Sequence, residues 1–230
     1  LIEPAAPWPS WTSKPGQWGY SDRRWAVDFN GDGRADYCRA VGNSSGANSW
    51  LGCAITTASG LTDGITMWAA VADWGHAGRR WMVDFNGDGK ADFCRAVGDS
   101  SGANSWLGCS FSTGSGLAAP ISIWAPVADW GYADRRWMID FNGDGKADFC
   151  RAVGAQNNSW LGCTFSNGTT FTASVDIWAT VGDWGFSDRR WMADFNGDGK
   201  VDYCRATGAS SGPGSFLTCS LSNGAGFGGT

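Results

Sequence analysis

The chain lacks several features that particular protein classes require. No run of about 18 apolar residues occurs among its 230 residues, so the sequence predicts no membrane insertion. The basic residues recur as isolated pairs and form no tract, which argues against nucleic-acid binding. No stretch keeps a 3.6-residue hydrophobic period, which argues against helices. A single histidine, His76, occurs in one place only and cannot belong to a repeated catalytic device.

What the chain has is one motif in four copies. Asp-Phe-Asn-Gly-Asp-Gly-Lys/Arg-Ala/Val-Asp begins at Asp28, Asp84, Asp140 and Asp194, with spacings of 56, 56 and 54 residues. A near-constant spacing of this size indicates one supersecondary unit repeated along the chain. We therefore expect a single domain over residues 1–230, with repeats at about 19–74, 75–130, 131–184 and 185–230, the last completed by 1–18.

Each unit has the pattern of four strands. In the second copy the strands are expected at 81–85, 92–97, 106–111 and 121–127, because these segments are rich in β-branched and aromatic residues and are separated by glycine-rich turns. Such a four-stranded antiparallel meander is typical of a propeller blade.

The two ends of the chain predict how the blades are arranged. The fourth unit has no fourth strand of its own, whereas Trp11 and Trp18-Gly19 resemble Trp124 and Trp130-Gly131. The N-terminal strand would complete the last blade, which leaves no free sheet edge. We thus expect an all-β, four-bladed propeller of four-stranded antiparallel blades, its ring closed by the N-terminal strand.

Eight cysteines fall two per repeat, on either side of a Gly/Ser/Asn-rich turn. No Cys-x-x-Cys pair is present, which argues against a zinc site. Pairing within each unit is the simplest of the possible connectivities, and it predicts disulfides in a secreted, extracellular protein whose export signal preceded Leu1. The expected pairs are Cys38 and Cys53, Cys94 and Cys109, Cys150 and Cys163, Cys204 and Cys219.

The repeated loop has the donor pattern of a calcium site. Oxygen donors stand at positions 1, 3, 5, 7 and 9, as in the first part of an EF-hand loop, while position 12 is a basic residue and strands flank the loop. We expect about four structural calcium ions; the alternative is a hairpin turn without metal. The expected ligands are Asp28, Asn30, Asp32, Arg34 and Asp36; Asp84, Asn86, Asp88, Lys90 and Asp92; Asp140, Asn142, Asp144, Lys146 and Asp148; Asp194, Asn196, Asp198, Lys200 and Asp202.

This loop between strands resembles the FG-GAP (VCBS) repeats of β-propellers, which include integrin heads and the Psathyrella velutina lectin type of sugar-binding propellers. The resemblance extends over the whole chain through its four copies. In that lectin type Trp and Arg near the sugar sites precede the same strand, and residues 74–80 are similar in outline. The resemblance implies a calcium-binding propeller that binds carbohydrate.

Topology places the ligand-binding candidates opposite the calcium loops. The turn after strand two and the crossover to the next blade lie at that end, where aromatic and charged residues gather. The candidates are Tyr20, Arg23, Trp50, Asp73, Trp74, His76, Arg79, Trp106, Asp129, Trp130, Tyr132, Arg135, Trp160, Asp183, Trp184, Phe186 and Arg189. Positions that vary between units, among them Asp22, Gly78, Asp134 and Asp188, are favoured as ligand contacts. The competing interpretation assigns the repeated tryptophan columns to the blade core, and the mid-strand arginines Arg39, Arg95, Arg151 and Arg205 to structural pairs with acids.

Three functions fit these patterns. A multivalent lectin for carbohydrate or glycoconjugate fits repeated shallow sites best. A polysaccharide hydrolase or lyase would need one asymmetric cluster of acids, and near-identical repeats offer no obvious one; the chain could also be an accessory module of such an enzyme. A protein-binding scaffold is the third. The sequence favours a binding protein over an enzyme and does not predict the oligomeric state.

Overall fold

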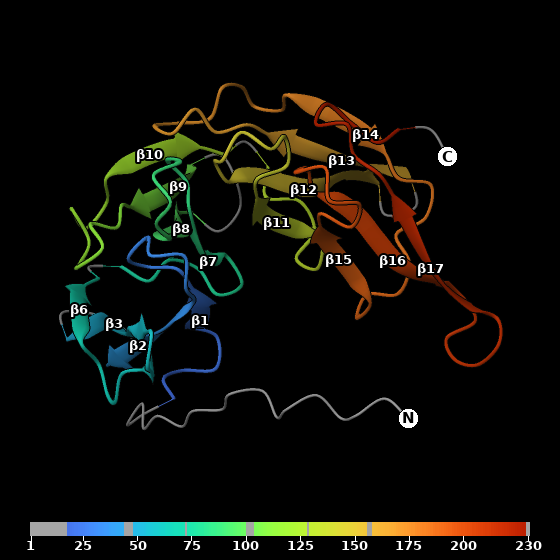
Figure 1. The fold of residues 1–230 in the computed structure, drawn as a ribbon. Coiled ribbons are helices and arrows are strands. Elements are labelled where there is room, and N and C mark those ends of the chain that lie inside the picture. Colours follow the sequence, from blue (N-terminus) through green and yellow to red (C-terminus); the bar gives the residue numbers. More distant parts are fainter. Residues whose placement is uncertain are drawn as a thin grey trace, which may run out of the picture.

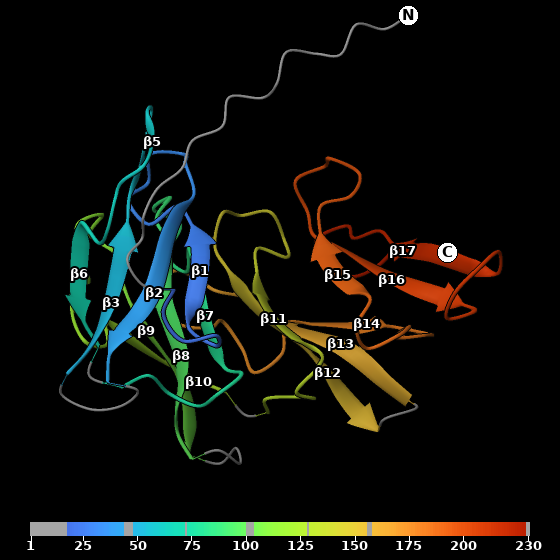
Figure 2. The same cartoon turned by 90° about the horizontal axis from the view of Figure 1, so that it is seen from below.

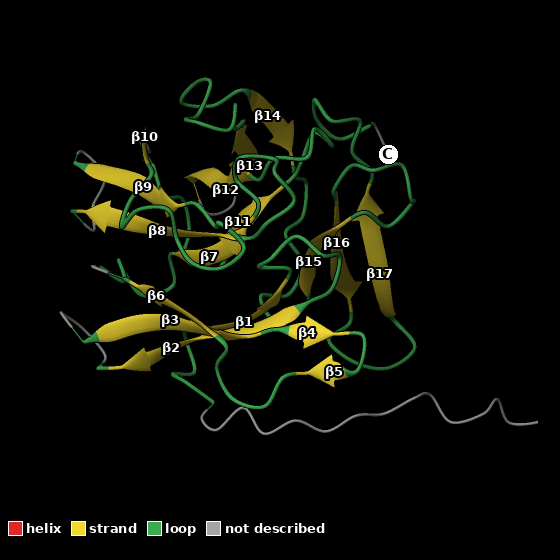
Figure 3. Cartoon of the chain, turned by 60° about the vertical axis from the view of Figure 1, so that its left-hand side comes forward, coloured by secondary structure: helices red, strands yellow, loops and turns green. Residues whose placement is uncertain are grey.

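The computed structural model of the protein describes residues 18–43, 48–71, 73–99, 104–127, 129–155 and 158–228. Within these ranges the regular structure is all β, with no helix (Figure 3). The strands are β1 Arg24–Val27, β2 Asp36–Gly42, β3 Ser49–Ala54, β4 Thr56–Thr57, β5 Gly60–Leu61, β6 Met67–Ala70, β7 Arg80–Val83, β8 Asp92–Gly98, β9 Ser105–Ser110, β10 Ile123–Pro126, β11 Arg136–Ile139, β12 Asp148–Ala155, β13 Asn158–Thr164, β14 Ile177–Thr180, β15 Arg190–Ala193, β16 Asp202–Gly208 and β17 Ser215–Ser220.

These strands form four small antiparallel sheets in a ring, the blades of a four-bladed β-propeller (Figure 1). Blade 1 has the order β1-β2-β3-β6, blade 2 β7-β8-β9-β10 and blade 3 β11-β12-β13-β14, while blade 4 is described as β15-β16-β17. The predicted fold class is confirmed. The N-terminal strand expected to complete blade 4 falls on residues 1–18, of which all but Trp18 lie outside the described ranges.

The four disulfides are formed as the repeat predicts. Strand pairing sets Cys94 opposite Cys109 and Cys150 opposite Cys163. Each pair of Cα atoms is 4.0 or 4.1 Å apart. The third bridge spans 13 residues rather than 15, and the register survives because a two-residue deletion at a hairpin turn removes one residue from each strand.

The hydrophobic core lies between blades. One cluster joins residues of blades 1 and 2, a second joins blades 2 and 3, and a third joins blades 3 and 4. Phe29, Phe85 and Phe141, the second residues of the first three motifs, are fully buried in these clusters, whereas Phe195 of the fourth motif is 47% exposed. In blades 1 to 3 the Phe of the motif is therefore a core residue, while its polar neighbours form the loop.

The mid-strand arginines are buried, as expected, and in blades 2 and 3 hydroxyl and carbonyl oxygens accept their hydrogen bonds. Arg95 donates hydrogen bonds to Ser110 Oγ at 2.9 Å and to the Pro120 carbonyl at 2.7 Å. Its guanidinium carbon lies 5.0 Å from the centroid of the Phe93 ring. Hydroxyl, carbonyl and ring contacts thus surround this cation, while its Nε is buried without a hydrogen-bond partner among the described residues. Burial lowers the pKa of Arg95 to about 10.

Candidate functional site

The loop between the first and second strands of each blade is closed by its own hydrogen bonds. In blade 1, Asp28 Oδ1 accepts the N–H groups of Gly31 and Asp32 at 2.7 and 3.1 Å, and Asp28 Oδ2 accepts that of Gly33 at 2.7 Å. Both glycines have positive φ, 79° and 82°, a region that other residues rarely adopt. The other three loops repeat this pattern.

The last acid of the motif is buried and connects the loop to the segment that follows the third strand. Asp36 Oδ2 accepts the N–H of Phe29 at 3.1 Å, and Asp36 Oδ1 accepts that of Thr56 at 2.7 Å. Burial raises the pKa of the equivalent Asp92 and Asp148 to about 7, although each also accepts two backbone N–H groups. An ionised carboxylate here is therefore costly unless a cation lies near it.

The loops have donors that suit calcium, but the side chains do not enclose an ion. Each loop holds three carboxylates and an amide oxygen within nine residues, the hard donors that calcium prefers. Among the described residues no group of three or more Asp, Glu, His or Cys side chains is placed to hold a metal. The acid at position 5 contacts the basic side chain at position 7, with Arg34 Nη1 3.0 Å from Asp32 and Lys90 Nζ 3.2 Å from Asp88.

At the opposite end, the variable residues of the crossovers bind the backbone of their own blade. The Tyr20 hydroxyl donates to the carbonyl of Gly42 at 2.8 Å, and His76 Nε2 lies 2.7 Å from the carbonyl of Gly98. Tyr132 makes the same contact in blade 3. These half-buried side chains thus connect each crossover to the end of the second strand.

The crossover acids also have a structural contact. Asp73 Oδ1 accepts the N–H of Gly75 at 2.8 Å, and Asp129 and Asp183 repeat this contact in the next two crossovers. All three residues are exposed, so they remain accessible from solvent. Phe186 replaces the Tyr or His in the last crossover and has no side-chain polar atom.

Three of the predicted ligand-binding tryptophans are buried between blades. Trp74, Trp130 and Trp184 are each less than a tenth exposed, and they contact Phe93, Phe149 and Tyr203 edge-on. Their ring faces are not open to solvent, which corrects the expectation that these tryptophans contact a ligand. Arg23, Arg79 and Arg135 lie over the same rings and therefore belong to the blade interfaces as well.

The tryptophans of the outermost strands, in contrast, are exposed. Trp68, Trp124 and Trp178 are 55%, 55% and 58% exposed, although a repeated column suggested blade core. On β10 buried and exposed residues alternate, and Trp124 is paired with Gly108, which has no side chain to cover it. The alternation in the sequence could have revealed this exposed column.

A second, half-buried tryptophan accompanies each exposed one. Trp50, Trp106 and Trp160 lie on the third strand, next to the strand that holds Trp68, Trp124 and Trp178. The rings of Trp106 and Trp124 are 6.4 Å apart at an interplanar angle of 84°. Two ring planes at a right angle therefore meet at the edge of blade 2.

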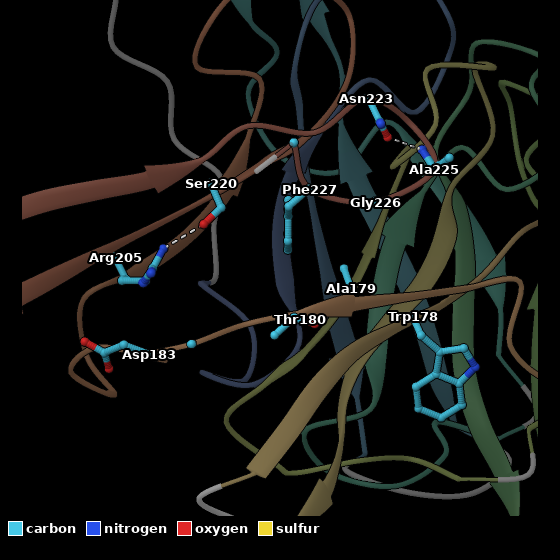
Figure 4. Close-up of a pocket in the computed structure, with 12 residues that line it drawn as sticks. Trp178, Ala179, Thr180, Asp183, Arg205, Ser220, Asn223, Ala225, Gly226 and Phe227 are labelled. Carbon is cyan, nitrogen blue, oxygen red and sulfur yellow. Dashed lines mark hydrogen bonds between the residues drawn. The ribbon is translucent and has the colours of Figure 1, made fainter. Parts of the chain in front are cut away.

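A hollow of about 700 Å³ lies between β14 and blade 4. It is lined by Asp183, Arg205, Ser220 and Phe227, while the Trp178 indole extends away from Phe227 (Figure 4). Arg205 Nη1 donates to Ser220 Oγ at 2.9 Å. Of these lining residues the sequence pointed to Asp183 as a ligand contact and missed Ser220 and Phe227, because they come from distant segments of the chain.

Comparison with known proteins supports the repeat. A family model described as an FG-GAP-like repeat matches residues 140–204. The NAD(+)–arginine ADP-ribosyltransferase Chelt of Vibrio cholerae is 32% identical over 130 residues, which are 56% of this chain. The chain spans only 20% of that protein's length.

Among solved structures, the Photorhabdus luminescens Tc holotoxin pore aligns with 92% of this chain and 12% of its own, at 16% identity and a TM-score of 0.36. Residues 140–204 match the FG-GAP-like repeat, and the chain that contains them is a four-bladed β-propeller.

Proposed function

We propose that the protein is a secreted, calcium-stabilised propeller that binds carbohydrate or glycoconjugate through repeated aromatic sites. The observation that supports this most directly is the column of Trp68, Trp124 and Trp178, each more than half exposed at the same place in its blade. Apolar side chains gathered at one place on a surface indicate an interaction site, and in blade 2 the exposed Trp124 lies beside Trp106.

The geometry suits a sugar ring. The apolar C–H face of a sugar stacks on a flat aromatic ring, and the hydroxyl groups at its rim need polar partners. Trp124 offers the platform, and Trp106 lies perpendicular to it as a side wall. Since blades 1 and 3 have tryptophans at the same two positions, weak sites on one molecule would add up on a multivalent glycan.

A glycan array, run once with calcium and once with EDTA, tests the binding. A monovalent sugar that binds is then titrated into the wild type and into Trp124→Ala. We expect the site in blade 2 to be lost and the sites of blades 1 and 3 to remain. Leu221→Ala, which removes another exposed apolar side chain, is the matched control. If no glycan binds in calcium, the proposal fails, and polysaccharide cleavage by the same sample would favour an enzyme.

The proposal includes calcium as an ion that stabilises the loops. The ligands would come from oxygens of the four motifs, for example Asp28, Asn30 and Asp32 in blade 1, and the ion would balance the buried Asp36. Chelation should lower the thermal midpoint because the ion binds only the folded loop. An unchanged midpoint in EDTA would remove calcium from the proposal.

Secretion is supported by the four disulfides, which persist in oxidising compartments. The described ranges contain no helix long and apolar enough to cross a membrane. Because this chain spans only a fifth of the Vibrio relative, we also propose that such a propeller can serve as the binding module of a larger protein.

A further inference from the structure

The three contacts between consecutive blades follow one template. The tryptophan on the first strand of each blade packs edge-on against an aromatic residue of the next blade. The pairs are Trp25 on Phe93, Trp81 on Phe149 and Trp137 on Tyr203, with ring centroids 6.0, 6.1 and 6.2 Å apart. We call the face of a blade that bears this tryptophan its front face. The face of the following blade that bears the aromatic partner is that blade's rear face.

A cation–π contact belongs to the same template. Arg23 of blade 1 lies 5.5 Å from the ring centroid of Trp74 in blade 2, and Arg79 lies 5.3 Å from that of Trp130 in blade 3. The third interface repeats the contact with Arg135 over a tryptophan of blade 4. Such a pair contributes more when its arginine is screened from water, as Arg135 is.

Two of the three interfaces add an ion pair. Arg80 Nη1 lies 2.6 Å from Asp22 of the preceding blade, and Arg190 Nη1 lies 2.8 Å from Asp134. Both arginine side chains are less than a tenth exposed, whereas the two aspartates are 45% and 43% exposed, so each pair lies at the rim of its interface. The middle interface has Gly78 at the place of the acid, and glycine cannot form such a pair.

The front face of blade 4 is exposed where the same face of every other blade is covered. Phe195 is 47% exposed and Leu217 59%, whereas their equivalents in blades 1 to 3 are fully buried. Trp191, the template tryptophan, is 46% exposed. None of the three core clusters of the described residues includes these side chains.

The rear face of blade 1 is exposed in the same way. Trp18 is 67% exposed, although its equivalents in the other three blades are buried. Ala26 and Ala35 beside it are exposed and Tyr37 is half-buried, at positions that are buried in blades 2 and 3. Figures 1 and 2 draw blade 1 and blade 4 at the two ends of the series of blades.

We propose that these two faces are the halves of a fourth template interface, and that a second copy of this chain docks on them head to tail. Trp191 of one copy would pack on Tyr37 of the other, and Arg189 would lie over Trp18. Asp188 would pair with Arg24, as Asp22 pairs with Arg80 and Asp134 with Arg190. Asp188 and Arg24 are both exposed.

Charge and shape both favour a copy of this chain over an unrelated partner. The exposed faces bear the two complementary halves of the template, aromatic on aromatic and acid on arginine, and a single molecule exposes both halves at once. Because the contact is heterologous, each copy would offer its front face to one neighbour and its rear face to another, which builds a closed ring or a chain of copies. The inference does not rest on calcium or carbohydrate binding.

Charge reversal tests the docking, with mass measured by analytical ultracentrifugation across protein concentrations. The mass of the wild-type species should rise with protein concentration, from that of one 24.3 kDa chain to that of two or more chains. Asp188→Arg and Arg24→Asp should each remain single chains, because like charges would meet at the interface. Asp99→Arg makes the same charge change at an exposed residue that follows β8 in blade 2, away from blades 1 and 4, and should associate as wild type does.

Mixing the two single variants gives the decisive result. Where the two variants alternate, the unchanged Asp188 of the Arg24→Asp variant meets the unchanged Arg24 of the Asp188→Arg variant. At the next interface the new arginine at position 188 meets the new aspartate at position 24, so the charges are again opposite. The mixture should therefore associate although neither variant does so alone, and the double variant should associate like wild type.

Two outcomes would overturn the proposal. One is a wild type that stays a single chain at every concentration. The other is a mixture that does not associate while the double variant regains the thermal stability that each single variant loses, since this would show that the two faces meet within one molecule.

Discussion

One leucine position gives a strong test of the blade interfaces. Leu107 on β9 is fully buried between Ala96 and Ala125 on the neighbouring strands, whereas Leu217 on β17 is paired with an alanine of β16 in the same way and is 59% exposed. Leu107→Ala and Leu217→Ala therefore make the same chemical change in two environments. The difference between them measures what the fourth strand and the next blade contribute together.

The expected loss of stability differs several-fold. Truncating a fully buried leucine removes its transfer free energy and leaves a cavity, which costs about 2–5 kcal/mol. The alanines on either side of Leu107 cannot extend to fill that cavity. For Leu217→Ala we expect a change of no more than about 0.5 kcal/mol, the usual range of an exposed substitution.

Urea unfolding followed by tryptophan fluorescence measures both variants, with the disulfides intact. Nanomolar protein keeps the copies apart, so the front face of blade 4 stays exposed during the measurement. With a slope of about 2 kcal/mol per molar urea, Leu107→Ala should lower the midpoint by about 1–2.5 M. Equal losses for the two variants at this dilution would refute the reasoning, because Leu217 would then be covered within one chain.

Three further predictions concern the loops, the disulfides and the crossovers. Burial raises the pKa of Asp92 to about 7, so the folded metal-free protein keeps a proton that the unfolded chain releases near pH 4; its urea midpoint should fall as the pH rises from 4 to 7, and Asp92→Asn should flatten that slope. Replacing Cys94 and Cys109 together with alanine opens a 15-residue separation and should cost about 3 kcal/mol of unfolding free energy, read from the same urea curves; a loss below about 1 kcal/mol would contradict the estimate. At Gly75, φ is +65° and a Cβ atom would collide with a carbonyl of β8, whereas at Gly78, φ is +71° and nothing lies within 4 Å, so Gly75→Ala should lower the thermal midpoint more than Gly78→Ala; equal shifts would show that only the backbone angle matters.

Much of this molecule could be predicted from its sequence because it is repeated. Strand positions, blade topology and all four disulfides follow from local patterns: alternating residues, glycine at the turns, and two cysteines placed symmetrically about each turn. A feature that recurs in every unit, such as the Gly-Asp-Gly loop, has the same local cause in every unit.

The exposure of the tryptophans was not predictable in this way. Trp74 and Trp124 each belong to a repeated column; the sequence placed Trp74 among the ligand candidates, while the competing interpretation assigned both columns to the blade core. In the structure Trp74 is covered by the preceding blade, as the core interpretation expected, whereas Trp124 lies on the outermost strand with glycine beside it. Burial depends on which surfaces meet, and that is not a property of one strand.

The sequence by itself determined the repeated unit, its strands and its covalent links, because short-range sterics and pairing within a hairpin decide them. Only the tertiary structure decided which faces are covered. Leu107 and Leu217 occupy the same position of the same unit, yet one is buried and the other exposed, because a fourth strand and a neighbouring blade cover Leu107, whereas blade 4 is described with three strands. The interfaces between blades therefore had to be seen before the exposed tryptophans and the open faces of blades 1 and 4 could be assigned a role.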